Sequence, residues 1–374
     1  MTEYKTVKLS DICILEKGQQ IDTTLLDDSK PYRYINGGIK ESGYFDEFNT
    51  SGESILISEG GASCGYINYV NENFWCGCHC YRLHDIKVFP KYLFHVLKAN
   101  QQRIMALRTG SAMPNIQKST IQKFEIRIHD NLTTQKKVST MLDKCNELIE
   151  KHKLTLEKYD SLIKSRFIEM FGDPVLNPKQ WSVEKLKTLT SKIGSGATPK
   201  GGRESYISEG ISLVRSMNVY KGYFEYDGLA HITEEQAREL DNVTLQENDV
   251  LINITGASVA RCCILPKAVL PARVNQHVSI LRTTDKLNPV YLSNLLITDT
   301  EQRVLLGIGG AGGATREAIT KTELETLDIP VPPMSLQNDF ASFVQQIDKS
   351  KFVVQQSLEK AETLYKSLMQ EYFG

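Results

Sequence analysis

Residues 133–172 read TTQKKVSTMLDKCNELIEKHKLTLEKYDSLIKSRFIEMFG. The stretch has no proline, and its first glycine, in Gly172-Asp173-Pro174, belongs to a typical helix stop signal. Apolar residues recur at intervals of four and three, and this period predicts a helix buried along one seam against another helix. One heptad position holds Leu142, Ile149, Leu156, Ile163 and Met170, and the other holds Val138, Cys145, His152, Tyr159 and Arg166. Roughly 38 helical residues make a rod of about 57 Å, which needs a partner to bury its apolar stripe.

The partner stretch lies in the same chain, at residues 335–374. An ungapped shift of 202, from Gln135 to Gln337, places Leu156-Glu157-Lys158 on Leu358-Glu359-Lys360 and Phe171-Gly172 on Phe373-Gly374. We therefore predict two helices that pack on each other; the alternative is that each is an ordinary amphipathic core helix. The predicted seam residues are Val138, Leu142, Ile149, Leu156, Tyr159, Ile163, Phe340, Val344, Ile347, Val354, Leu358 and Tyr365.

The regions before the two helices also repeat each other in order. Gly61-Ala62-Ser63 after an apolar strand recurs as Gly256-Ala257-Ser258, and Pro90-Lys91-Tyr92-Leu93 recurs as Pro289-Val290-Tyr291-Leu292. Short β-branched segments bounded by Gly, Asn or Ser predict strands, and Tyr92–Leu107 and Val290–Leu306 follow a helical pattern. The predicted fold class is α+β, with two homologous β-rich globular parts, each followed by a long helix. The predicted boundaries are 1–132 and 181–334 for the globular parts, 133–172 and 335–374 for the helices, and 173–180 for a linker.

The charge balance excludes a basic nucleic-acid binder of the usual kind. The net charge is −1, and residues 1–130 carry 15 Lys and Arg against 15 Asp and Glu. Residues 181–334 carry 16 Lys and Arg against 18 Asp and Glu. Positive charge for binding DNA must therefore be concentrated on one face of the protein or supplied by a partner. No apolar run is long enough to span a membrane, and eight unevenly spaced cysteines without a signal peptide suggest free thiols in a reducing cytoplasm.

Cys76-Gly77-Cys78-His79-Cys80 resembles a metal site, but its spacing argues against one. On a strand the three cysteines would share one face at successive separations of about 6.6 Å, too far apart for a tetrahedral zinc site. The matching stretch Val274–Val278 has no cysteine, so we predict buried thiols and no metal. Cys262-Cys263 is likewise predicted to pack in the core.

No catalytic motif is evident. Gly307–Gly312 formally matches GxGxxG, but it follows a helical segment where a dinucleotide site would follow a strand, so we predict a flexible loop over Gly307–Gly313. The chain has no amino-methyltransferase motif and no nucleophile elbow, and Asp85-Ile86-Lys87 is an isolated D-x-K without a counterpart in the second half. We expect no catalytic residue and no cofactor in this chain.

Polar loop residues are the remaining functional candidates, because Arg, Asn and Gln make bidentate contacts to purine edges in the major groove. For any one of them, a solvated loop or a local turn bond is the simpler explanation. The candidate DNA-binding residues are Arg33, Asn36, Ser63, His79, Arg108, Ser111, Arg215, Asn218, Ser258, Asn275, Gln276, His277 and Arg316.

The whole chain resembles the specificity subunits of type I restriction–modification systems. The resemblance rests on the duplicated plan, on Phe171-Gly172-Asp173-Pro174 before Trp181, and on Asn275-Gln276-His277. It also includes Ile329-Pro330-Val331-Pro332-Pro333, which leads to Gln337. The first half departs from this pattern, with Cys78-His79 in place of Asn-Gln-His and no double proline in Ile126–Asp130.

The resemblance implies two target-recognition domains, each of which reads half of a bipartite DNA site. It implies that the helices pack as an antiparallel coiled coil, set the spacing and dock two methyltransferase subunits. Those subunits would bind S-adenosylmethionine and methylate adenine, and two restriction subunits, where present, would use ATP and Mg. The alternatives are a structural adaptor without sequence-specific DNA binding, and a single-chain nuclease or methyltransferase, which the missing motifs disfavour.

Overall fold

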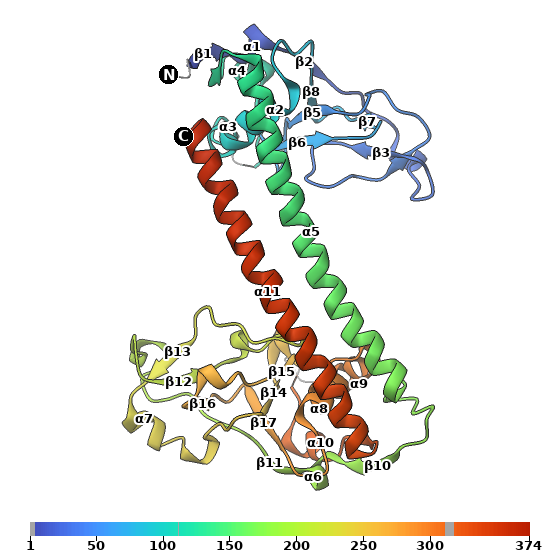
Figure 1. Cartoon of the computed structure of the whole chain (residues 1–374), viewed down its shortest axis with the longest axis vertical. Helices are drawn as coiled ribbons and strands as arrows, with labels where there is room; N and C mark the ends of the chain where they lie inside the picture. The colour runs from blue at the N-terminus through green and yellow to red at the C-terminus, as the bar shows by residue number, and fades with distance from the viewer. Residues whose placement is uncertain (1–3, 111, 311–317) are drawn as a thin grey trace. The chain divides into compact units, whose positions relative to one another are not determined.

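The structure is a computed structural model that describes residues 4–110, 112–310 and 318–374 (Figure 1). It divides into two compact units, which are described separately. Unit 1 comprises Met1–Lys153 and Gln355–Gly374, and unit 2 comprises Leu154–Val354. Each unit therefore contains one globular part together with a portion of both long helices.

Unit 1 is built around an antiparallel sheet with the order β2-β8-β5-β6. Its strands are β2 (Ile14–Lys17), β8 (Cys80–His84), β5 (Ser54–Ser58) and β6 (Ile67–Val70). A second sheet has the order β4-β3-β7, from β4 (Tyr44–Phe45), β3 (Tyr32–Ile35) and β7 (Trp75–Cys76), in which β3 and β7 are parallel. The central strand β5 is almost wholly buried, as expected for a continuous apolar run covered on both faces.

The termini of the first globular part meet in a two-stranded antiparallel ribbon, β1 (Tyr4–Lys8) with β9 (Glu125–His129). The short helices are α1 (Leu9–Ile12), α2 (Pro90–Ala99), α3 (Gln101–Met105) and α4 (Lys118–Gln122). The single helix expected over Tyr92–Leu107 is therefore two helices, which meet at Asn100. The Asn100 side chain donates a hydrogen bond to the Val96 carbonyl at 2.8 Å, and such local bonding competes with helix continuation.

Unit 2 repeats this topology. Its main sheet has the order β11-β17-β14-β15, from β11 (Thr190–Ser195), β17 (Val278–Thr283), β14 (Val250–Asn253) and β15 (Cys262–Ile264). Its second sheet is β13-β12-β16, from β13 (Ala230–Ile232), β12 (Ile211–Val214) and β16 (Ala272–Val274), and its ribbon pairs β10 (Ser182–Lys185) with β18 (Asp328–Val331). The same strand order and the same parallel pair, β12 with β16, confirm the predicted duplication.

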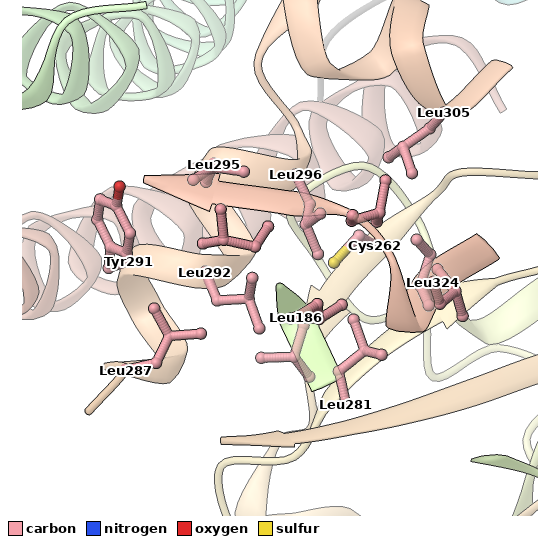
Figure 2. Close-up of a cluster of buried hydrophobic side chains, with 14 of the residues drawn as sticks. Leu186, Cys262, Leu281, Leu287, Tyr291, Leu292, Leu295, Leu296, Leu305 and Leu324 are labelled. Atoms are coloured by element: carbon pink, nitrogen blue, oxygen red, sulfur yellow. The ribbon is translucent and has the colours of Figure 1, made fainter. Parts of the chain in front are cut away.

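The short helices of unit 2 are α6 (Leu186–Leu189), α7 (Glu234–Arg238), α8 (Pro289–Leu296), α9 (Asp299–Gly310) and α10 (Lys321–Glu325). All but α7 contribute to the apolar cluster on one side of the main sheet, whereas Ala237 of α7 belongs to a separate cluster. Figure 2 shows leucines from α6, α8, α9 and α10 converging on Cys262 and Leu281 of the sheet. Gly307–Gly310 belong to α9, so the loop predicted there is wrong at these four positions, and 311–313 lie outside the described residues. Helical hydrogen bonding outweighs the low helix propensity of glycine here.

The two long helices are α5 (Leu132–Phe171) and α11 (Met334–Phe373). In unit 1, Val138 and Leu142 of α5 belong to the same apolar cluster as Leu368 and Tyr365 of α11. In unit 2, Ile163 of α5 clusters with residues near the start of α11. The beginning of each helix thus packs with the end of the other, which confirms antiparallel packing. All of the predicted seam residues are buried or half-buried: Val138, Leu142, Ile149, Leu156, Tyr159, Ile163, Phe340, Val344, Ile347, Val354, Leu358 and Tyr365.

The heptad pattern misses the most deeply buried residues near the end of α5. Arg166 and Met170, at its heptad positions, are half-buried, whereas Phe167 and Phe171 beside them are 1% and 2% exposed. Both phenylalanines pack on Tyr291 of α8 and Phe340 of α11, with ring centroids 4.7–5.5 Å apart. The buried face changes here because the globular core contacts the helix in addition to the partner helix.

The cysteine-rich stretch is not one strand. Cys76 ends β7 and Cys80 begins β8, with a turn over Gly77–His79 between them. The shared-face geometry expected for the three cysteines is therefore wrong, although Cys76 and Cys80 are buried free thiols, as are Cys262 and Cys263. Within the residues that the structure describes, no group of three or more His, Cys, Asp or Glu could hold a metal ion. Across the same residues, no helix is both long and apolar enough to cross a membrane.

Candidate nucleic-acid interface

Matching glycine turns mark equivalent edges of the two globular parts. Gly61 follows β5 and Gly256 follows β14, with φ of +78° and +74°, values that side-chain-bearing residues rarely adopt. No atom lies within 4 Å of the position that a Cβ would take at either glycine. Open space and the absence of a side chain leave the backbone of both turns accessible to a large ligand.

A returning segment lies alongside each turn. Asn115, which follows the loop after α3, forms an antiparallel bridge with Gly60, and Ala318, which follows the segment after α9, forms one with Thr255. Arg108 is exposed at the start of the first of these loops. Ser111 and Arg316, the other two candidates of these loops, lie outside the described residues. Asn115 and Ala318 thus occupy equivalent places beside the glycine turns of the two units.

In unit 2, three of the candidates form a connected polar network beside the turn. Gln276 is exposed; its side-chain oxygen accepts a hydrogen bond from the Thr198 hydroxyl at 2.6 Å, and its amide nitrogen lies 3.1 Å from His277 Nε2. An amide NH₂ only donates, so this contact is a hydrogen bond in the tautomer whose Nε2 accepts and whose Nδ1 carries the proton. That Nδ1 lies 2.6 Å from Thr255 Oγ1. Asn275 supports the turn by accepting a bond from the His277 backbone N–H at 3.0 Å.

Several unit 2 candidates are structural. Asn218 has no exposed surface, and its amide accepts from the Arg215 N–H and donates to the Glu225 carbonyl. Asn275 is 5% exposed. Because both asparagines are buried, neither side chain is available to contact a base. Arg215 is half-buried, lies over the Tyr206 ring and donates to the Gly228 carbonyl. Ser258 is half-buried in the turn itself.

In unit 1 the corresponding edge is arranged differently. The Asn36 side chain accepts a hydrogen bond from the His79 N–H at 3.0 Å, and the Ser63 hydroxyl donates to the Gly37 carbonyl. The His79 side chain is 57% exposed, with Nδ1 4.0 Å from a Glu59 oxygen. Arg33, a candidate for DNA contact, forms ion pairs with Glu72 and Glu41 in this structure.

Sequence reasoning missed an ion pair beside the unit 1 turn in which only the carboxylate is buried. Glu59, whose side chain is 9% exposed, pairs with Lys17 Nζ at 2.7 Å and accepts a hydrogen bond from the Tyr81 hydroxyl at 2.7 Å. Burial and the Glu59 carboxylate raise the pKa of Tyr81, which keeps its hydroxyl a donor. One feature of the sequence could have indicated this ion pair. Glu59 directly precedes the Gly60-Gly61 turn, and the equivalent residue in the second half is the apolar Ile254.

Sequence reasoning also missed an aromatic stack in unit 2. The rings of Tyr220 and Tyr223 lie 5.0 Å apart and nearly parallel, and the Arg261 guanidinium lies 4.7 Å from the Tyr220 ring centroid. Tyr223 is 54% exposed. The run VYKGYFEY at residues 219–226, dense in tyrosine, was the available signal. An exposed stack of this kind can pack on a base or a sugar.

Comparison with solved structures supports the fold. The crystal structure of the S subunit of a type I restriction–modification system from Mycoplasma genitalium has a TM-score of 0.74 at 19% identity. That alignment covers 100% of this chain and 96% of the other.

Two curated relatives extend the comparison to sequence. A Mycoplasma genitalium protein, whose name assigns it provisionally to the type I specificity subunits, is 30% identical over 185 residues. That match covers 49% of this chain and 48% of the relative, so the chain spans about half of the relative's length. The specificity subunit of the Escherichia coli type I restriction enzyme EcoBI is 19% identical over 323 residues, which make up 77% of this chain and 65% of that protein.

A family model matches both halves of the chain. The model describes the type I restriction modification DNA specificity domain, and the matched residues are 1–158 and 178–363. The match includes both glycine turns and most of both long helices. Because these residues make up most of the chain, the chain belongs to the type I restriction modification DNA specificity domain family.

Proposed function

We propose that this chain is the DNA-specificity subunit of a type I restriction–modification complex, and that it has no catalytic activity of its own. The observation that carries the proposal is the duplicated polar edge, with Gly61 and His79 in one globular part and Gly256 and His277 in the other. Each edge would read one half of a bipartite, asymmetric site in double-stranded DNA. Family membership supports this assignment.

The polar edges of the two globular parts would differ in the side chains that they present to DNA. The second would present Gln276, whose amide suits adenine, together with His277 and the exposed Tyr223. The first would present His79 and Arg108 above the Lys17–Glu59 pair. Different side chains at equivalent places in one fold account for an asymmetric site.

The partners would supply the reaction. Two methyltransferase subunits would dock on the long helices, bind S-adenosylmethionine and methylate adenine, and two restriction subunits, where the system has them, would bring ATP and Mg. The formal charge of −1 supports this division of labour. Affinity for DNA depends mainly on phosphate neutralisation, so a neutral reader needs partner subunits that supply positive charge around the duplex.

The decisive experiment is to produce the chain in cells with the methyltransferase subunit of its own system and to map N6-methyladenine across the genome. We expect one bipartite motif with a constant gap, absent when this chain is omitted. Gln276→Ala should relax or abolish recognition in one half-site only, whereas the control Gln246→Ala, at an exposed position outside the network, should leave the motif unchanged. No new methylation by a folded, associated pair would favour an adaptor role.

A further inference from the structure

Unit 2 contains a cavity of about 690 Å³ that DNA recognition does not use. It opens to the surface and is lined by α9, α10, β10, β18 and the segment that follows α5. Its wall is apolar at Val304, Ile308 and Leu327 and acidic at Glu301, Glu323 and Asp328. Carboxylates repel phosphate, so the cavity is unsuited to nucleic acid.

Glu301 is the unusual group in this wall. It is 4% exposed, and it lies on the same face of α9 as Val304 and Ile308, three and seven residues further on. Its backbone N–H donates to Thr298 Oγ1, but within the described residues no hydrogen bond or ion pair engages its carboxylate. A buried carboxylate without a partner is rare, because removing its hydration costs several kcal/mol.

The neighbouring carboxylates are already engaged. Asp328 pairs with Lys185 Nζ at 2.7 Å, and Glu323 accepts hydrogen bonds from the Thr320 N–H and hydroxyl at 2.7 and 2.8 Å. Burial, with the charges of Asp173 and Asp328, raises the pKa of Glu301 to about 7. A cation that enters the cavity would therefore meet one carboxylate with free acceptor positions.

We propose that this cavity is a docking site for an arginine side chain of a partner protein. The guanidinium would pair with Glu301, and the aliphatic stem would lie against Val304, Ile308 and Leu327. Arginine fits better than lysine because its planar fork binds a carboxylate through two parallel hydrogen bonds and is more weakly hydrated. The inference concerns a protein partner and holds whether or not the chain reads DNA.

The surroundings of the cavity favour a protein surface over a metal ion or a free small molecule. Val175 and Val183 line it and are 47% and 49% exposed, and Leu176 beside them is 77% exposed. Exposed apolar side chains around a buried polar group are typical of a protein interface. Among the described residues, these carboxylates included, no group of three or more His, Cys, Asp or Glu could hold a metal ion.

The test uses the full chain with ¹³C-labelled isoleucine and valine methyl groups. Nα-acetyl-arginine amide should shift the Ile308 and Val304 signals, and Nα-acetyl-citrulline amide, which has nearly the same shape but no charge, should bind at least tenfold more weakly. Glu301→Gln should weaken the arginine response at least tenfold. The control Glu325→Gln, at a carboxylate of α10 that does not line the cavity, should preserve it.

Three outcomes would overturn the proposal. An equal response to the citrulline derivative would identify a merely apolar pocket. A response of the same signals to MgCl₂ but not to the arginine derivative would identify a metal site. Tighter binding of free arginine than of the blocked derivative would identify a small-molecule site, because Glu323 and Asp328 should repel a free α-carboxylate and make that amino acid bind at least fivefold more weakly.

Discussion

Gln135 and Gln337 occupy equivalent positions near the starts of the long helices and make equivalent bonds. Gln135 accepts a hydrogen bond from the Phe89 N–H at 2.9 Å and donates to the His129 carbonyl at 2.7 Å. Gln337 accepts from the Asn288 N–H and donates to the Pro332 carbonyl, both at 2.8 Å. Each glutamine ties its long helix to the end of a ribbon strand and to the residue before the proline that begins α2 or α8.

Replacing Gln337 with leucine should therefore destabilise the protein. Gln337 is fully buried, and the change leaves a buried N–H and a buried carbonyl unpaired, at a cost of about 2–4 kcal/mol. Denaturant unfolding monitored by circular dichroism measures the loss. The control is Gln345→Leu, at an exposed position on the same helix, which should change stability by less than about 0.5 kcal/mol. Equal effects of the two variants would contradict the bonding role.

Glu301 makes stability depend on pH in a predictable direction. Its pKa is raised from 4.5 to about 7 in the folded chain, so folding favours the protonated form. The stabilisation by that proton is complete below about pH 4.5 and is lost as the pH rises through 7. Glu301→Gln should thus be more stable than the original chain by up to about 3 kcal/mol at pH 8, and the difference should vanish near pH 4.

The comparison of the original chain with Glu301→Gln must also consider the acidic residues that surround Glu301. Asp173, Asp328 and Glu323 surround Glu301, but all three are present in both variants, so the difference between the two stability curves reports on position 301. Denaturant unfolding of both variants at several pH values gives those curves. A difference that does not vary with pH would mean that the pKa of Glu301 is the same in the folded and the unfolded chain, which would contradict the prediction.

At the scale of elements, the long helices carry the clearest prediction. We expect that adding one heptad of seven residues to both helices, after Lys153 in α5 and after Val354 in α11, preserves the seam register. The addition lengthens each helix by about 10.5 Å, close to the rise of three base pairs. Methylation mapping should then find unchanged half-sites with a longer gap.

The control for this experiment replaces seven exposed helix residues without changing the helix length, and it should leave the gap unaltered. A longer chain that still recognises the original gap would rule out the helices as a spacer.

The globular elements were less predictable than the long helices. The repeated Pro-x-Tyr-Leu located α2 and α8, because proline at the first helical position and a buried tyrosine are local signals. The helical state of Gly307–Gly310 could not be foreseen, because glycine lowers helix propensity. There α9 packs on the core, with Leu305 fully buried.

At the scale of the whole molecule, each globular part has a core of its own. Leu15, Ile57 and Val96 belong to the cluster of unit 1, whereas Ile252, Leu281 and Leu292 belong to a cluster of unit 2. Exchanging residues 1–130 for the equivalent part of a relative with another target should therefore leave the second reader folded. Methylation mapping should find one half-site changed and the other retained.

The reciprocal exchange of residues 181–334 serves as the control and should alter the other half-site. Changes on both sides after a single exchange would contradict the assignment of one half-site to each part.

The sequence by itself determined the duplicated plan, the pairing of the two long helices and the glycine turns, because periodicity, order and backbone freedom are local properties of the chain; the antiparallel direction came from the family resemblance. Only the tertiary structure decided which polar residues are available. Asn218 bonds to the Glu225 carbonyl and Arg33 pairs with Glu72, whereas no hydrogen bond or ion pair within the described residues engages the Glu301 carboxylate. Burial and pairing depend on which distant segments meet, and residue type and spacing do not encode that directly.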